Sequence, residues 1–178
     1  MINPLHNSVN LSTYRKRVIA EKTVEWCKAN LGTKRSKLTL KVRKANALAL
    51  KENEVGHFKY WNNEMVLNHD VCKSVRMILT TVIHEYTHYL QPMRQKYVEL
   101  YEKHGYWKHP FEVEARSNEK LWTKCYEEVV KPYLIKSGLW SITRDLCPPH
   151  RTDQDLCNLD DLVSYNQLVS PKSRIWQM

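Results

Sequence analysis

The sequence contains little glycine and no closely spaced pair of cysteines. With 4 glycines in 178 residues, it has no glycine-rich loop that could hold nucleotide phosphates. The 5 cysteines include no C-x-x-C pair, which excludes a ribbon-type zinc site. Their odd number and scattered spacing favour free thiols in a reducing compartment. They are Cys27, Cys72, Cys125, Cys147 and Cys157.

Long apolar runs are also absent. No stretch reaches the roughly 20 apolar residues of a membrane helix. Residues 1–10 are mostly polar and contain a proline, unlike a secretory signal. We therefore expect a cytoplasmic protein that makes no membrane contact. The length and a hydrophobic content of 42% predict a single domain over residues 1–178, with its core at about 12–131 and a C-terminal extension at 132–178.

Acidic residues are outnumbered by basic ones, 19 against 28, which gives a formal net charge of +9. The basic residues cluster at 15–17, 34–37, 41–44 and 94–96. Such charge predicts non-specific contact with polyanions. No helix or sheet that reads a nucleic-acid sequence is recognisable, and a solvated basic surface is the simpler interpretation.

One short string indicates a specific chemistry. His84-Glu85-Tyr86-Thr87-His88 has the H-E-x-x-H spacing. In a helix this spacing places the two histidines on one face, one turn apart, where both can bind one Zn²⁺. Glu85 then lies beside the metal, where it can act as general base for a water whose pKa the zinc lowers. The alternative is a pair of polar side chains on a helix surface.

The surrounding residues predict the required helix, from about Val71 to Gln91, with Pro92 as its stop. At about 100° per residue, apolar side chains gather on the side opposite the histidines. The helix should therefore pack that side into the core and turn His84 and His88 towards a cleft. The apolar residues are Val75, Leu79, Val82, Ile83, Tyr86, Tyr89 and Leu90.

Zinc needs at least a third protein ligand. The longer metzincin form of the motif is absent, because Gln91 stands where that form requires glycine. A second helix is predicted from Pro110 to about Val130. On this helix Glu114 lies at the edge of the apolar side, whereas Glu112 and Glu119 point further outwards. An acid facing the core is costly unless it is paired or bound to metal, so Glu114 is the predicted third ligand.

Other roles stay open for the residues around this second helix. Glu114 could be an ordinary first-turn acid, stabilised by the helix dipole. His104 and His109 lie in the predicted loop between the two helices and are alternative metal ligands. Together with Tyr106 they are also candidates for the hydrogen-bond donor that stabilises an oxyanion during catalysis. Their simpler interpretation is aromatic packing over the core.

His84, Glu85 and His88, with the downstream Glu114, resemble the gluzincin metallopeptidases. The resemblance spans about Lys37 to Trp122 and is closest to minimal members, the ImmA/IrrE-like peptidases and phage-encoded zincins. It implies a zinc metalloendopeptidase that cuts protein or peptide substrates. It also implies an α+β zincin-like domain, in which a small mixed or antiparallel sheet packs on the helices that carry the ligands. A phage protein of this kind could be associated with the virion.

Two further interpretations stay open. A zinc site with four protein ligands would indicate a structural or virion-associated protein. The segment His104-Gly105-Tyr106-Trp107 is distantly similar to an element of the SprT-like proteases, which act on proteins crosslinked to DNA. The cysteine-rich ribbon of those proteases is absent here. A DNA-associated protease is therefore the second alternative.

The rest of the core is predicted to contain a helix from about Ser12 to Leu31 and a small sheet formed by residues 37–42 and 55–67. Asn62-Asn63 predicts a turn within the second of these segments. We expect Val66-Leu67-Asn68 to lie nearest the metal helix, where a free strand edge could pair with an extended substrate.

Overall fold

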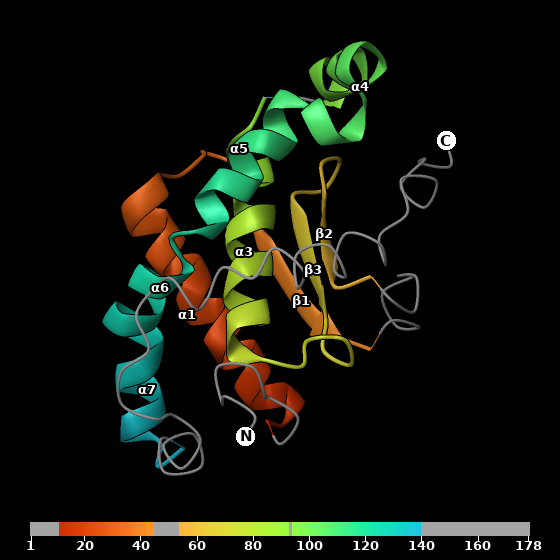
Figure 1. Ribbon diagram of the computed structural model, residues 1–178. Coiled ribbons are helices and arrows are strands. Elements are labelled where there is room, and N and C mark those ends of the chain that lie inside the picture. Colours follow the sequence, from red (N-terminus) through yellow and green to blue (C-terminus); the bar gives the residue numbers. More distant parts are fainter. Residues whose placement is uncertain (1–10, 45–53, 93, 140–178) are drawn as a thin grey trace.

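The computed structural model of the chain describes residues 11–44, 54–92 and 94–139 (Figure 1). The described elements form a mixed α+β arrangement, as predicted, in which helices predominate over a small sheet. In chain order they are α1 (Thr13–Leu31), β1 (Thr39–Arg43), β2 (Gly56–Lys59), β3 (Glu64–Asn68), α3 (Val75–Leu90), α4 (Arg94–Lys108), α5 (Pro110–Glu119), α6 (Trp122–Cys125), the π-helical turn η2 (Tyr126–Val130) and α7 (Lys131–Lys136).

Helix α1 has the boundaries that its sequence predicts. The hydroxyl of Ser12 accepts a hydrogen bond from the backbone N–H of Arg15, which caps the first turn. Gly32 follows the last turn with φ +96°, a value that favours glycine. Trp26 and Cys27 are buried, and α1 packs along α3. The predicted helix at the start of the core is therefore confirmed.

The sheet has the strand order β1-β3-β2, with β1 parallel and β2 antiparallel to β3. The turn between β2 and β3 contains Asn63 at φ 50°, the left-handed region that asparagine tolerates. This confirms the predicted hairpin. The expectation for Val66-Leu67-Asn68 as a free edge was wrong, because these residues belong to β3, which is paired on both sides. The strand that combines contact with α3 and an edge position is β2.

Helix α3 begins at the cap residue Ser74, whose hydroxyl accepts a hydrogen bond from the N–H of Met77, and ends at Leu90. It runs through the middle of the fold and contacts the sheet, α1 and α5 (Figure 1). The side opposite the histidines is buried, as predicted, but His84 and His88 are buried as well, at 9% and 5% exposure. They therefore face a covered interior and not the open cleft that the sequence suggested.

Glycine permits the close approach of β2 to its neighbours. A Cβ atom on Gly56 would lie 2.6 Å from the carbonyl oxygen of Val66 and 3.0 Å from Cγ2 of Thr81. The first contact is with backbone of β3, so a side chain would push the strand away. Because residue 56 has no side chain, β2 can pack closely against both β3 and α3.

The single helix predicted over 110–130 is replaced by a chain of shorter ones. Helix α5 ends at Glu119. After Lys120 and Leu121, α6, η2 and α7 follow one another directly, with Pro132 in the first turn of α7. His104 lies inside α4, not in a loop, and His109 is the cap of α5. Within the described residues no helix is both long and apolar enough to cross a membrane. Most of the predicted extension at 132–178 lies outside the described residues.

Candidate metal centre

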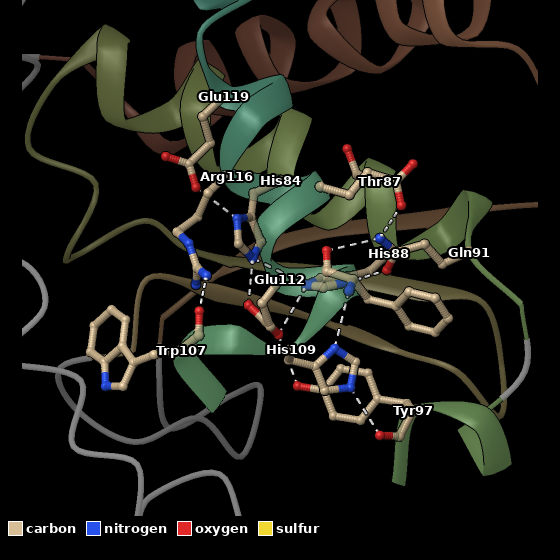
Figure 2. A network of polar contacts seen from close by, with 12 residues as sticks. His84, Thr87, His88, Gln91, Tyr97, Trp107, His109, Glu112, Arg116 and Glu119 are labelled. Carbon is tan, nitrogen blue, oxygen red and sulfur yellow. Dashed lines mark hydrogen bonds and ion pairs between the residues drawn. The ribbon is translucent and has the colours of Figure 1, made fainter. Parts of the chain in front are cut away.

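Three side chains from two helices converge on one point in the interior (Figure 2). The Nε2 atoms of His84 and His88, one turn apart on α3, are 3.1 Å from each other. The carboxylate of Glu112, in the first turn of α5, lies 3.5 Å from the first ring and 3.4 Å from the second. One potential ligand atom from each residue lies within 4.8 Å of the other two. Two imidazoles and a carboxylate form a typical donor set for Zn²⁺.

A carboxylate behind His84 fixes the orientation of its ring. Nδ1 of His84 lies 2.7 Å from Oε1 of Glu119, the last residue of α5. Since an ionised carboxylate only accepts hydrogen bonds, Nδ1 carries the proton and donates it. Nε2 therefore points towards Glu112 and His88, and a metal ion bound there would take the place of a proton on this nitrogen.

His88 is oriented by the side-chain amide of Gln91, the residue that follows α3. The NH2 group of Gln91 donates to the carbonyl oxygen of Phe111 and to Oε2 of Glu114, each at 2.9 Å. The amide can therefore face His88 only with its oxygen, and Nδ1 of His88 donates to that oxygen at 2.7 Å. Nε2 of His88 is thereby left as an acceptor towards the centre of the cluster.

We expect Gln91→Ala to weaken zinc binding by about 10–100-fold, the usual effect of removing the partner that orients a ligand. Without the amide, the tautomer and the angle of the His88 ring are no longer fixed. The measurement is a competition titration with a chromophoric chelator. Asn118→Ala is a suitable control, because Asn118 ties α5 to Thr87 of α3 without contacting any of the three converging residues. Equal affinities of Gln91→Ala and wild type would contradict this role.

Glu112, and not the predicted Glu114, lies with the two histidines. Glu112 is 1% exposed, whereas Glu114 contacts the cluster only through Gln91. The prediction took the apolar side of one long helix as its reference, and that side included residues that belong to α6 and η2. On α5 alone, Glu112, Ala115 and Glu119 are spaced three and four residues apart and form one face. This face lies against α3.

Charge explains why such a cluster is stable in the interior. Burial alone lowers the pKa of His84, but its interactions with Glu112 and Glu119 outweigh burial and raise the pKa to about 10. Burial raises the pKa of Glu112, but the two histidines outweigh it and hold that pKa far below its usual range. Both pKa shifts arise because the buried carboxylate of Glu112 is stabilised by positive charge beside it. A divalent cation between the three residues supplies that charge, so the cluster fits a metal ion.

Tyr97 of α4 supports the carboxylate from the other side. Its hydroxyl donates to Oε1 of Glu112 at 2.8 Å, and its ring stacks on His109 with centroids 4.1 Å apart. Both nitrogens of His109 are used. Nδ1 accepts from the N–H of Phe111 as the cap of α5, and Nε2 donates to the carbonyl oxygen of Tyr97. The structure thus places His109 as a fixed support under the site, without a free nitrogen for a metal or substrate.

The two other predicted donors lie further from the centre. His104 is exposed on α4, and Tyr106 is half-buried near the end of that helix. Arg116 of α5 approaches the rings of Tyr106 and Trp107, at 5.9 and 5.7 Å from their centroids, and donates to the carbonyl oxygen of Trp107. These contacts join α4 to α5. The structure does not bring His104 or Tyr106 together with the histidine pair.

Glu85 is a buried acid on α3, next to His84 in the chain, and its role as general base stays a prediction. It is 5% exposed, and its negative charge contributes to the raised pKa values of His84 and Tyr60. Among the described residues, no hydrogen bond or ion pair engages its carboxylate. A buried acid beside a metal-binding group, and not occupied by another residue, is suited to exchange protons with a bound molecule.

No family model, curated protein or solved structure matches this chain. The resemblance to gluzincins stays a prediction that rests on the H-E-x-x-H motif. The acidic residue that lies with the two histidines is Glu112, whereas that resemblance was drawn with Glu114.

The sequence did not predict the residues that surround and support His84, His88 and Glu112. In the sequence, Gln91 is notable only because it stands where the metzincin motif requires glycine. The predicted long helix has Glu119 pointing outwards. Tyr60 and Tyr97 carry no motif at all, since their proximity to the histidines depends on how the hairpin and α4 pack. The sequence does contain one relevant signal. The spacing of Glu112, Ala115 and Glu119 indicates that both glutamates lie on one face of a helix.

Several of the basic residues are engaged within the fold. Nζ of Lys16 is buried and donates to the carbonyl oxygens of His69 and Cys72. Lys34 donates to the carbonyl oxygen of Gln91, and Arg17 pairs with Glu21 on α1. Part of the excess positive charge thus has a structural role. Contact with polyanions stays a prediction.

Proposed function

We propose that this protein is a zinc-dependent metallopeptidase in which His84, His88 and Glu112 hold one Zn²⁺. The observation that carries this proposal is the convergence of the three side chains within 4.8 Å of one another, next to the buried Glu85. A histidine pair with a glutamate from a later helix is the ligand set of the gluzincins that the sequence resembles. The zincin-like interpretation of the α+β fold is part of the same proposal.

The number of ligands favours catalysis over a purely structural metal. Within the described part of the chain, the cluster consists of three residues that can bind metal. Structural zinc sites are closed by four protein ligands, whereas catalytic sites keep one position for water or substrate. Glu119 cannot supply the fourth ligand in this arrangement, because its carboxylate is the partner of Nδ1 of His84.

Glu85 is the proposed general base. Zinc, when bound, supplies a Lewis acid that makes water nucleophilic near neutral pH. Glu85 would take a proton from the attacking water and would deliver it to the leaving amine. The shielded position of Glu85 strengthens its charge interactions, because the surroundings have a lower dielectric constant than water. The substrate class, a protein or peptide, follows from the family resemblance.

The experiment is a measurement of metal content by mass spectrometry, followed by proteolysis of casein by the same sample. We expect one zinc per chain, and cleavage that stops when a chelator removes the metal and returns when zinc is added. Zinc that raises the unfolding temperature without any cleavage would instead support a structural protein. A chain that takes up no zinc, even after reconstitution, would overturn the proposal.

A further inference from the structure

The tyrosine that follows β2 lies at the edge of the proposed site. Tyr60 is the first residue after Lys59, at the turn into β3. Its ring contacts Phe58 edge-on at 5.0 Å between centroids, and it lies 6.5 Å from the ring of His88 and 6.2 Å from that of Tyr97. The seating of β2 against α3 thus brings the end of the hairpin to the histidine pair.

The hydroxyl of Tyr60 is buried and has no hydrogen-bond partner among the described residues. Buried tyrosine hydroxyls usually have a partner, and leaving one unsatisfied destabilises the fold. The neighbouring Tyr97 shows the usual situation, since its hydroxyl donates to Glu112. An unsatisfied buried donor on a ring beside His88 is expected where a bound molecule provides the missing acceptor.

The charges around this hydroxyl keep it a donor. Burial raises the pKa of Tyr60 above its ordinary value near 10, and the negative charges of Glu85 and Glu112 raise it further. The hydroxyl therefore keeps its proton at neutral pH.

We propose that Tyr60 is a catalytic residue, whose hydroxyl donates a hydrogen bond to the carbonyl oxygen of the substrate as that oxygen becomes negatively charged. This inference rests on the proposed peptidase function. It assigns the stabilising donor to the β2–β3 turn upstream of the histidine motif. The alternative donors His104, Tyr106 and His109 all lie downstream of the motif. His104 is exposed, Tyr106 packs against Trp107 and Arg116, and both nitrogens of His109 are engaged.

The test compares Tyr60→Phe with Tyr97→Phe in the full chain. Each change removes one hydroxyl from an aromatic ring, but among the described residues only the hydroxyl of Tyr97 has a hydrogen-bond partner. For Tyr60→Phe we expect kcat on a peptide from casein to fall about 10²–10³-fold, the usual effect of losing one such donor, with KM within about twofold. Zinc affinity should equal that of wild type, and the unfolding temperature of the zinc-free chain should not fall. Tyr97→Phe should weaken zinc binding by about 10–100-fold.

Two results for Tyr60→Phe would overturn the inference. One is an unchanged kcat, and the other is a fall in kcat together with a lower unfolding temperature, which would indicate a structural hydroxyl. The wild-type chain is assayed first. If it binds no zinc or cuts nothing, the proposed function fails, and the inference fails with it. If wild type is active, a negative result for Tyr60→Phe concerns Tyr60 alone.

Discussion

Glu85→Gln is expected to abolish proteolysis while leaving the zinc content unchanged. Glutamine has the same shape as glutamate and cannot accept the proton of the attacking water, so the change removes general-base catalysis, which contributes about 10²–10⁴-fold to a rate. Metal binding should persist because Glu85 is not one of the three residues that converge. The measurement is initial cleavage rate per bound zinc, on protein whose metal content is determined in the same sample.

Glu21→Gln provides a matched control for Glu85→Gln. Glu21 is an exposed glutamate on α1 that pairs with Arg17, and surface pairs of this kind contribute little to stability. This variant should bind zinc and cut substrate as wild type does. If Glu85→Gln retained the wild-type rate with its zinc bound, Glu85 would not be the general base.

The second large effect is expected at the acidic ligand. Glu112→Gln should weaken zinc binding by more than about 100-fold, beyond the range seen for residues that only orient a ligand. The substitution keeps the volume of the side chain and removes the negative charge, which the buried cluster needs to hold a cation. Affinity is measured by competition with a chromophoric chelator at fixed pH.

Glu114→Gln is the matched control, because the two glutamates lie two residues apart on the same helix. Glu114 contacts the cluster only through the amide of Gln91. We expect its replacement to change zinc affinity by no more than about tenfold. The opposite result, in which Glu114→Gln loses zinc and Glu112→Gln keeps it, would restore the ligand that the sequence predicted.

Local signals in the sequence predicted much of the scaffold. Ser12 and Gly32 delimit α1 because a cap residue and a glycine satisfy the ends of a helix wherever the chain later packs. The turn at Asn62-Asn63 formed the hairpin for a similar reason, since asparagine accepts the backbone geometry that such a turn requires. The two histidines face one point because their spacing alone places them on one face of α3.

The acidic residue that lies beside the two histidines depends on where the second helix ends, and helix ends are difficult to predict from a sequence. The prediction treated residues 110–130 as one helix, whereas α5 ends at Glu119 and is followed by α6 and η2. Angular positions counted along all of these residues do not describe the side chains of α5 alone. Residues 111–119 alone point Glu112 and Glu119 to the same side. The two residues between α5 and α6 are Lys120 and Leu121. Neither is a proline or a glycine, so no residue type marks the end of α5 in the sequence. The correct choice between two glutamates therefore required the packed structure.

The supporting polar contacts could not be predicted from the sequence either. The hydroxyl of Tyr97 meets Glu112 across 15 residues, and the ring of Tyr60 meets that of His88 across the interface between the hairpin and α3. Such contacts arise from tertiary packing and leave no periodic pattern in the chain. The H-E-x-x-H motif is recognisable in the sequence, whereas the residues of other elements that contact it are identified only in the folded structure.

The hydrogen bonds of Gln91 define how relatives of this protein could be recognised. Its side-chain oxygen and its NH2 group are both engaged, so a glutamate at this position would set a second acceptor against Glu114 and an alanine would leave His88 unsupported. A chain that shares the same centre should therefore keep a glutamine three residues after the second histidine. It should also keep two glutamates seven residues apart on the helix that corresponds to α5, the second helix after that glutamine. This combined signature is more selective than H-E-x-x-H alone, and it remains detectable when the overall similarity of two sequences has been lost.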